Sequence, residues 1–444
     1  MSSSSPPETT TGKNGGSAET AAAANAGGRR WEVADVVRRY GDEFRALYRP
    51  LPEQRRVLWA IENCQTEVLG GHWMHCEGCA REHGAYHSCR NRHCPSCLGS
   101  ACARWVEAER AQLLPVPYFH VVFTLPHTLN PLLRVNQALL YGLLFQCAAA
   151  TLQQFAADPD WLGAQLGITA VLHTWGQTME YHVHLHCVVT GGGLGCDGKR
   201  WKLPRKGRKG KGFLFHVLPL GEVFRAKYRD GLERLRREGK LVYLGESAGL
   251  ADDASWRKWL DEVLAQNWVV YAKRPFAGPD RVLKYLSRYT HRVAISNQRI
   301  VDINDETGKV HFTYKDYRGA KESEGVEGDG KKGKEKKPKR RVMKLDVMEF
   351  LRRFLQHVRP KGFVRIRHYG IVGNRGRKEK LAQARRALGV ATPVDPGENA
   401  LSLSATDTNE EPQEKPTGRR CPHCGSTHLR IIRAIPRQPR SRSP

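Results

Sequence analysis

The segment from His182 to Gly193 constrains the fold most, because it places an imidazole at every second position and then enters an apolar run. Alternate side chains of a β-strand point to the same face. His182, His184 and His186 therefore share one face of a predicted strand, and three glycines permit a sharp turn at its end. The segment predicts either a histidine face that holds a divalent metal ion or a polar sheet surface without a ligand.

A second constraint comes from two Cys-x-x-Cys pairs, Cys76 with Cys79 and Cys94 with Cys97, which are separated by fourteen residues. Each pair can sit in a tight turn that aims both sulfurs at one ion, so the spacing predicts a structural Zn²⁺ bound by four thiolates. A redox pair is the competing interpretation. Further candidate ligands in this region are Cys64, Cys89, His72 and His93.

A third Cys-x-x-Cys pair, Cys421 with Cys424, lies near the end of the sequence, with His428 close by. No second cysteine pair follows it, so the sequence provides only half of a zinc-binding motif there. Whether this pair binds an ion is left open by the spacing.

The charge of the chain indicates its partner. The 444 residues carry a net charge of +27, which favours a polyanion, and we expect DNA rather than a membrane surface. No apolar run reaches 18 residues, and the N-terminus lacks a secretory signal, so a cytoplasmic protein is expected. In a reducing compartment, the twelve cysteines are expected to bind metal rather than to form disulfides.

Composition divides the chain into six predicted regions. They are a disordered tail at 1–30, a helical and zinc-binding DNA-contact domain at 31–112, a catalytic domain at 113–317, a flexible Lys/Gly-rich insert at 318–341, a basic helix-strand-helix region at 342–390, and a disordered linker with the Cys-x-x-Cys tail at 391–444.

Several strands are expected within these regions. Residues 167–175 should pair antiparallel with the histidine strand, which would bring Gln177 or Glu180 near the histidines. Residues 293–297 and 310–317 are predicted to form a second strand pair, and residues 344–355 an amphipathic helix. In a predicted strand at 362–370, Arg365 and Arg367 share a face and are candidate DNA contacts.

Tyr285 and Tyr289 lie one turn apart if their segment is helical, so both phenols could reach one phosphate. A tyrosine oxygen can attack phosphorus when a nearby metal ion or cation offsets its poor ionisation. Arg288 and Arg292 could stabilise the charge that develops. The competing interpretation is that the tyrosines pack in the core.

Taken together, these segments resemble the transposases of the insertion sequence 91 family, which belong to the two-tyrosine HUH class. The resemblance covers roughly Tyr40 to Gly389 and rests on six motifs in a fixed order. They are Ser88–Cys97, His120–Pro126, His182–Gly193, Tyr285–Asn297, Phe350–Val358 and Arg365–Gly370.

The resemblance implies an α+β fold, in which an HUH-endonuclease-like domain with a central antiparallel sheet flanked by helices follows a small zinc-binding module. It implies that His184 and His186 hold a catalytic Mg²⁺ or Mn²⁺, although His182 and His184 fit the same motif. A further polar ligand is expected but not placed. Tyr285 and Tyr289 match the family's nucleophiles, which would cut single-stranded DNA through 5′-phosphotyrosine intermediates during rolling-circle transposition.

Two other functions fit parts of the same pattern. A plasmid replication initiator or relaxase shares the metal and tyrosine chemistry, but the zinc module and the C-terminal motifs argue against it. A zinc-dependent DNA-binding regulator would need no paired tyrosines. The resemblance favours a bacterial, nucleoid-associated transposase.

Overall fold

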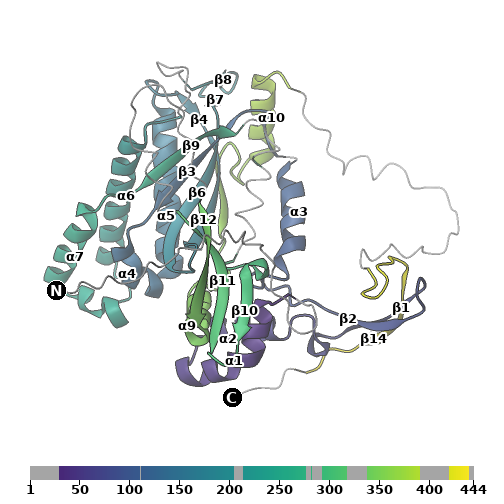
Figure 1. Cartoon of the computed structure of the whole chain (residues 1–444). Helices are drawn as coiled ribbons and strands as arrows, with labels where there is room; N and C mark the ends of the chain where they lie inside the picture. Colours follow the sequence, from purple (N-terminus) through teal and green to yellow (C-terminus); the bar gives the residue numbers. More distant parts are fainter. Residues whose placement is uncertain are drawn as a thin grey trace, which may run out of the picture.

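The computed structural model describes residues 30–110, 112–204, 214–276, 282, 293–317, 338–390 and 420–439. Predictions for residues 1–29, 318–337 and 391–419 lie outside this part of the chain, as do those for Tyr285, Tyr289, Arg288 and Arg292. The described residues form helices and antiparallel sheets (Figure 1). The prediction of an α+β protein is therefore confirmed.

A five-stranded antiparallel sheet with the order β13-β5-β6-β3-β9 forms the centre of the larger part of the molecule. Its strands are β3 (Tyr118–Thr124), β5 (Gly167–Trp175), β6 (Tyr181–Thr190), β9 (Val270–Phe276) and β13 (Ile366–Gly370). The middle strand β6 is the segment with alternating histidines, so its strand prediction is confirmed. Its two neighbours, β5 and β3, are also rich in β-branched and aromatic residues, which suit a sheet interior.

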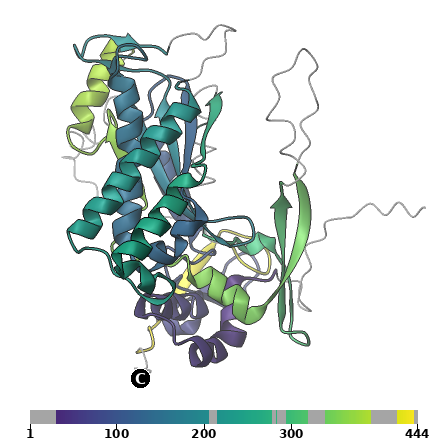
Figure 2. The same cartoon turned by 90° about the vertical axis from the view of Figure 1, so that its left-hand side faces the viewer.

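Helices cover one face of this sheet (Figure 2). They are α4 (Asn130–Val135), α5 (Gln137–Ala157), α6 (Val217–Arg237) and α7 (Asp253–Ala265). Leu185 and Phe123 of the sheet are fully buried against Leu144 and Phe224 of these helices. Burial of each such side chain contributes about 1.5–3 kcal/mol. This core gives β6 a rigid base, while its histidines face the other way.

The opposite face of the sheet is covered at its two ends by separate clusters. At one end, α3 (Leu98–Arg110) and α10 (Arg377–Ala387) pack over Tyr118 and Val188. At the other end, α1 (Val33–Tyr48), α2 (Pro52–Glu62) and α9 (Val347–Leu355) form a core that includes Met179. Along the chain, the histidines of β6 lie between Met179 and Val188, and hence between the two clusters.

A second sheet packs with α9 and consists of β10 (Ile300–Asn304), β11 (Lys309–Asp316) and β12 (Lys339–Asp346). The strand predicted at 293–297 is wrong, because these residues form no strand and the pairing begins at β10. The helix predicted from residue 344 begins at Val347. Asp346 caps it there, because its carboxylate accepts from the backbone N–H groups of Met348 and Glu349.

A third sheet, β14-β1-β2, joins the two ends of the chain. It contains β1 (Gly71–Cys76), β2 (Glu82–Tyr86) and β14 (Leu429–Ile435). β14 lies in the predicted Cys-x-x-Cys tail, for which the sequence predicted no strand. The β1–β2 hairpin leaves one edge of β1 open, and β14 occupies that edge.

The remaining elements are short. They are β4 (Ala164–Gln165), β7 (Gly193–Gly195) and β8 (Trp201–Lys202), which form a small sheet, and the 3₁₀ turns η1 (Glu67–Leu69), η2 (His127–Leu129), η3 (Gly245–Ala251) and η4 (Asn297–Arg299). Within the described ranges, no helix is long and apolar enough to cross a membrane.

Candidate active site and metal centres

The histidines of β6 meet a histidine of the neighbouring strand. The antiparallel register places His173 of β5 directly opposite His184. Directly paired residues of adjacent antiparallel strands point to the same face. His173, His184 and His186 therefore point to one side of the sheet, away from the α5–α6 core.

These three imidazoles converge closely enough to hold one metal ion. One ring nitrogen from each lies within 4.8 Å of the others. The ring centroids of His173 and His186 are 4.5 Å apart, and those of His184 and His186 are 4.8 Å apart. Three imidazole ligands leave coordination positions for water or for oxygens of a substrate. Such a centre can activate a phosphodiester rather than only stabilise the fold.

Neighbouring groups orient two of the three rings. The Nδ1–H of His184 donates to the backbone oxygen of His182 at 2.9 Å, which directs its Nε2 lone pair away from that carbonyl. His120 Nε2 of β3 lies 2.8 Å from His186 Nδ1. Such contacts fix the tautomer and orientation of a metal ligand. His120 is thus a candidate positioning residue.

Burial keeps the imidazoles of His184 and His186 neutral, as metal ligation requires. Burial, followed by the nearby His182, lowers the pKa of His184 to about 3. The pKa of His186 is held well below its ordinary value by burial and then by His173. At neutral pH both rings can therefore offer a lone pair.

The sequence-based ligand set differs from this group. His184 and His186 belong to it, but His182 does not, so the pair His182 and His184 is not favoured. His182 Nδ1 instead lies 2.8 Å from His127 Nε2. The structure brings in His173, which the sequence prediction missed. Strand register could have found it, because the pairing of residues 167–175 with β6 was predicted.

Neither guess for the further ligand joins the histidines. Gln177 Oε1 accepts from the backbone N–H of Lys315 on β11 at 3.4 Å. Glu180 is exposed in the turn before β6 and is absent from the three-histidine group.

The segment with Tyr285 and Tyr289 lies outside the described residues, but its described neighbours lie on the histidine side of the sheet. Val282 is fully buried in the cluster that contains Val188 of β6. Val293 lies in the cluster at the other end of this face, with Met179. Val282 and Val293, which flank the tyrosine segment in sequence, therefore lie on the same side of the sheet as the three histidines.

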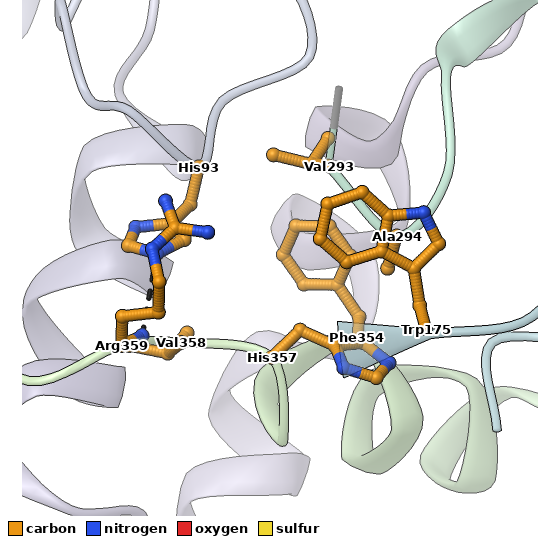
Figure 3. Close-up of a pocket in the computed structure, with 8 residues that line it drawn as sticks. All are labelled: His93, Trp175, Val293, Ala294, Phe354, His357, Val358 and Arg359. Carbon is orange, nitrogen blue, oxygen red and sulfur yellow. Dashed lines mark hydrogen bonds between the residues drawn. The ribbon is translucent and has the colours of Figure 1, made fainter. Parts of the chain in front are cut away.

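A small cavity lies next to the histidine group (Figure 3). One wall is Trp175, whose ring stacks on His173 with centroids 4.7 Å apart. His93 and Arg359 form the facing wall, and the backbone N–H of Arg359 donates to His93 Nε2 at 3.4 Å. The cavity therefore joins the cysteine-rich region to the end of β5.

Arg359 brings positive charge into this wall. It is only 4% exposed, and in the described part of the chain its Nε has no hydrogen-bond partner. Burial, and then the nearby Arg365 and Arg92, hold its pKa well below the usual range. Burial of a cation is costly when, as here, the described residues supply no carboxylate partner.

The predicted DNA contacts Arg365 and Arg367 both have protein neighbours. The guanidinium of Arg367 lies over the ring of Phe145, 4.4 Å from its centroid. Burial, followed by Arg92, lowers the pKa of Arg365 to about 10. Both arginines thus have a packing environment, and their contact with DNA stays a prediction.

The cysteines form two groups of four rather than one. Cys64, Cys89, Cys94 and Cys97 form the first group, and Cys76, Cys79, Cys421 and Cys424 form the second. The grouping of Cys76 and Cys79 with Cys94 and Cys97 is therefore wrong. The β1–β2 hairpin places Cys76 and Cys79 next to β14, where they meet Cys421 and Cys424. Cys89, predicted as a possible ligand, belongs to the first group, whereas His72, His93 and His428 belong to neither.

The sulfur spacing in both groups matches a tetrahedral zinc site. Cys64 and Cys97 sulfurs are 3.5 Å apart, as are those of Cys76 and Cys424. A tetrahedron with Zn–S bonds of about 2.3 Å has edges of about 3.8 Å. The two sulfurs of a disulfide, by contrast, are about 2.05 Å apart, and these cysteines are free thiols. Each group could therefore hold one Zn²⁺.

Two family models match the chain. The model described as "Transposase zinc-binding domain", of the IS91 type, matches residues 36–125. The model described as "Putative transposase" matches residues 167–380, a range that includes the histidine group and the tyrosine segment. Cys421 and Cys424 lie beyond both matches.

Two relatives also match over most of their length. The chain is 46% identical over 394 residues to "Putative transposase y4qJ" of Sinorhizobium fredii (strain NBRC 101917 / NGR234), which covers 88% of this chain and 92% of the relative. It is 29% identical over 332 residues to "Transposase for insertion sequence element IS801" of Pseudomonas savastanoi pv. phaseolicola, with 74% of this chain and 73% of that protein covered. No solved structure matches.

Proposed function

Because the chain belongs to the insertion sequence 91 family of transposases, with an N-terminal zinc-binding domain, we propose that it moves its element by HUH-type, rolling-circle strand transfer. The observation that carries this proposal is the convergence of His173, His184 and His186 on central strands of an antiparallel sheet. The matched transposase region contains these three histidines.

The donor set fits a divalent transition metal. Mg²⁺ takes oxygen ligands, whereas imidazole is a common ligand of divalent transition metals, so His173, His184 and His186 suit Mn²⁺ better than Mg²⁺. When bound, the ion withdraws charge from the scissile phosphate and fixes its orientation. His120 and the backbone oxygen of His182 hold the rings ready for this role.

Tyr285 and Tyr289 supply the nucleophiles in this proposal. The phenolic oxygen loses its proton and attacks phosphorus, so that a P–O bond to tyrosine forms while the P–O3′ bond breaks. The leaving 3′-oxygen gains a proton, and the 5′-phosphate stays on the tyrosine. Attack by another 3′-hydroxyl reverses the step and joins strands without hydrolysis. Arg288 and Arg292 would stabilise the additional phosphate charge.

The DNA is held as a single strand where it enters the site. The net charge of +27 supports binding to phosphates, and unpaired bases beside the scissile phosphate would let one strand pass between the clusters that cover the histidine face. The first cysteine group, Cys64, Cys89, Cys94 and Cys97, holds a structural Zn²⁺ in the matched zinc-binding domain. A location in the bacterial cytoplasm, at the nucleoid, stays a prediction.

A cleavage assay tests the proposal. Labelled single-stranded oligonucleotides that carry element ends are incubated with Mn²⁺ and the protein, and nicking is read on denaturing gels. The Tyr285→Phe, Tyr289→Phe double variant should lose nicking but retain DNA affinity, while Tyr314→Phe on β11 serves as the matched control. Equal nicking by the double variant and the unmodified protein would refute the assignment, and would favour a contaminating nuclease or another nucleophile.

A further inference from the structure

The second cysteine group joins parts of the chain that are far apart in sequence. Cys76 and Cys79 lie at the β1–β2 turn, and Cys421 and Cys424 lie directly before β14. Strand β14 pairs with β1 in antiparallel register, with Leu429 opposite Cys76. In Figure 1 this small sheet extends away from the rest of the molecule, at the lower right.

The sheet has little hydrophobic core of its own. In its three strands, Met74 and Cys76 are the buried side chains that the structure describes. Ile431 and Ile432 of β14 remain 40% and 44% exposed. A three-stranded sheet with so few buried side chains needs another source of stability, and small domains commonly obtain it from a bound metal.

The two halves of the group have the same local geometry. The backbone N–H of Ala80 donates to Cys76 oxygen at 2.8 Å, and that of Gly425 donates to Cys421 oxygen at 2.9 Å. Ala80 has φ 56° and Gly425 has φ 76°, so both residues that follow the second cysteine are left-handed. A left-handed alanine is unusual. Two matching turns of this kind aim four sulfurs at one point.

The halves also contact each other directly. The backbone N–H of Glu77 donates to the backbone oxygen of His428 at 3.1 Å. A Cβ on Gly78 would lie 3.0 Å from the Cβ of Ser426, so the turns are tightly packed. The sulfurs of Cys79 and Cys421 are 3.7 Å apart, close to the edge of a zinc–thiolate tetrahedron.

We propose that Cys76, Cys79, Cys421 and Cys424 bind a second Zn²⁺ that clamps the C-terminal residues 420–439 onto the N-terminal module. The clamp links segments that lie before and after the catalytic region in sequence. It also supplies Cys421 and Cys424 with the second cysteine pair that a zinc-binding motif requires. Because each of the two cysteine groups can hold one ion, the protein should carry two zinc ions. This site is independent of the proposed strand-transfer chemistry.

The test uses the full chain with a specific protease site introduced between residues 391 and 419. The purified protein is cut in the presence of a reducing agent and then passed over a size-exclusion column. The C-terminal fragment should co-elute with the rest of the protein, and a strong zinc chelator should release it. Release of the fragment from the zinc-loaded protein, without chelator, would overturn the proposal.

Metal content gives a second readout. The Cys421→Ser, Cys424→Ser variant should fall from two zinc ions per chain to one, and its fragment should separate after cleavage. Cys196→Ser is the matched control, since Cys196 is exposed and belongs to neither group, and it should keep two. Equal zinc content in the unmodified protein and the double variant would also overturn the proposal.

Discussion

The second cysteine group, Cys76, Cys79, Cys421 and Cys424, and the histidine face would bind metal for opposite reasons. In the sheet β14-β1-β2, Met74 and Cys76 are the buried side chains within the described strands, so the proposed ion would supply much of the stability. Under the histidines, Leu185 of β6 is fully buried on a large helical core. There the core holds the sheet, and the sheet positions the histidines proposed as ligands. The contrast teaches that ligand type and underlying core together separate a structural ion from a reactive one.

The coordination chemistry follows the same division. Four thiolates fill a tetrahedral zinc shell, which leaves no position for a substrate. Three imidazoles leave positions open, and His120 holds one of the rings from the next strand. The predictions below test this division, beginning with the largest effect.

Removal of zinc should unfold the N-terminal module but leave the central sheet folded. Binding of structural zinc in small modules is worth roughly 10–16 kcal/mol, more than such a module can replace by packing. Limited proteolysis with mass spectrometry should show rapid cleavage within residues 64–97 after treatment with a strong chelator. Residues 118–190 should remain protected. Equal protection of both regions would remove the distinction between them.

Loss of one histidine should abolish activity without affecting the fold. His173→Ala removes one of the three proposed ligands, so DNA nicking should fall by more than about 100-fold, a larger loss than that expected from a residue that only orients a ligand. Its melting temperature should fall by only a few degrees, because the apolar face of β5 keeps its packing while Ala loses the stacking on Trp175. His182→Ala is the matched variant, and should retain nicking within about threefold. A larger loss of nicking in His182→Ala than in His173→Ala would instead favour His182 and His184 as the metal-binding pair.

A smaller effect is expected at the positioning residue. His120→Ala removes the contact to His186 Nδ1 but no proposed ligand. Loss of such a partner typically costs about 10–100-fold in metal affinity or activity. The Mn²⁺ concentration that gives half-maximal nicking should rise, and excess Mn²⁺ should restore part of the rate. An unchanged Mn²⁺ requirement would show that His120 does not orient the site.

The smallest expected effect concerns α3, which links the first cysteine group to the sheet. Burial raises the pKa of Glu109 to about 7, although Arg377 partly offsets this. His368 Nε2 lies 3.6 Å from Glu109 Oε1, and this imidazole is neutral because burial lowers its pKa to about 4. Because folding raises the pKa of Glu109, the protonated carboxyl is favoured in the folded protein. The corresponding part of the folding stability is fully present below the ordinary pKa of a glutamate, and it is lost as the pH rises through about 7.

Glu109→Gln should therefore raise the melting temperature by a few degrees at pH 8 and much less at pH 5. The measurement is a pair of thermal melts across this pH range, with exposed Glu107→Gln on the same helix as control. A gain that is equal at both pH values would indicate that the carboxyl does not titrate in the folded protein. It would also leave the link between the two regions insensitive to pH.

Local patterns predicted the parts of the site that depend on a single segment. The alternation of His182, His184 and His186 predicted the middle strand of the sheet, and the transposase family followed from motifs in order. The alternation of histidines did not predict His173, because its place in the site depends on the register between β5 and β6.

The cysteine partners could not be derived from spacing. Fourteen residues between two Cys-x-x-Cys pairs suit a shared ion, but the β1–β2 hairpin separates them in space. The partners of Cys76 and Cys79 in the second group lie more than 340 residues away, and the pairing of β14 with β1 brings them together. Such long-range strand pairing leaves no periodic mark in the sequence.

The most direct test of the central claim is detection of the covalent intermediate. The purified protein is incubated with single-stranded element ends and Mn²⁺, and protein–DNA adducts are mapped by mass spectrometry. The account predicts a 5′-phosphotyrosine adduct on Tyr285 or Tyr289 that disappears with EDTA and in His173→Ala. Tight DNA binding without any adduct, across varied ends and metals, would contradict strand transfer by this chain.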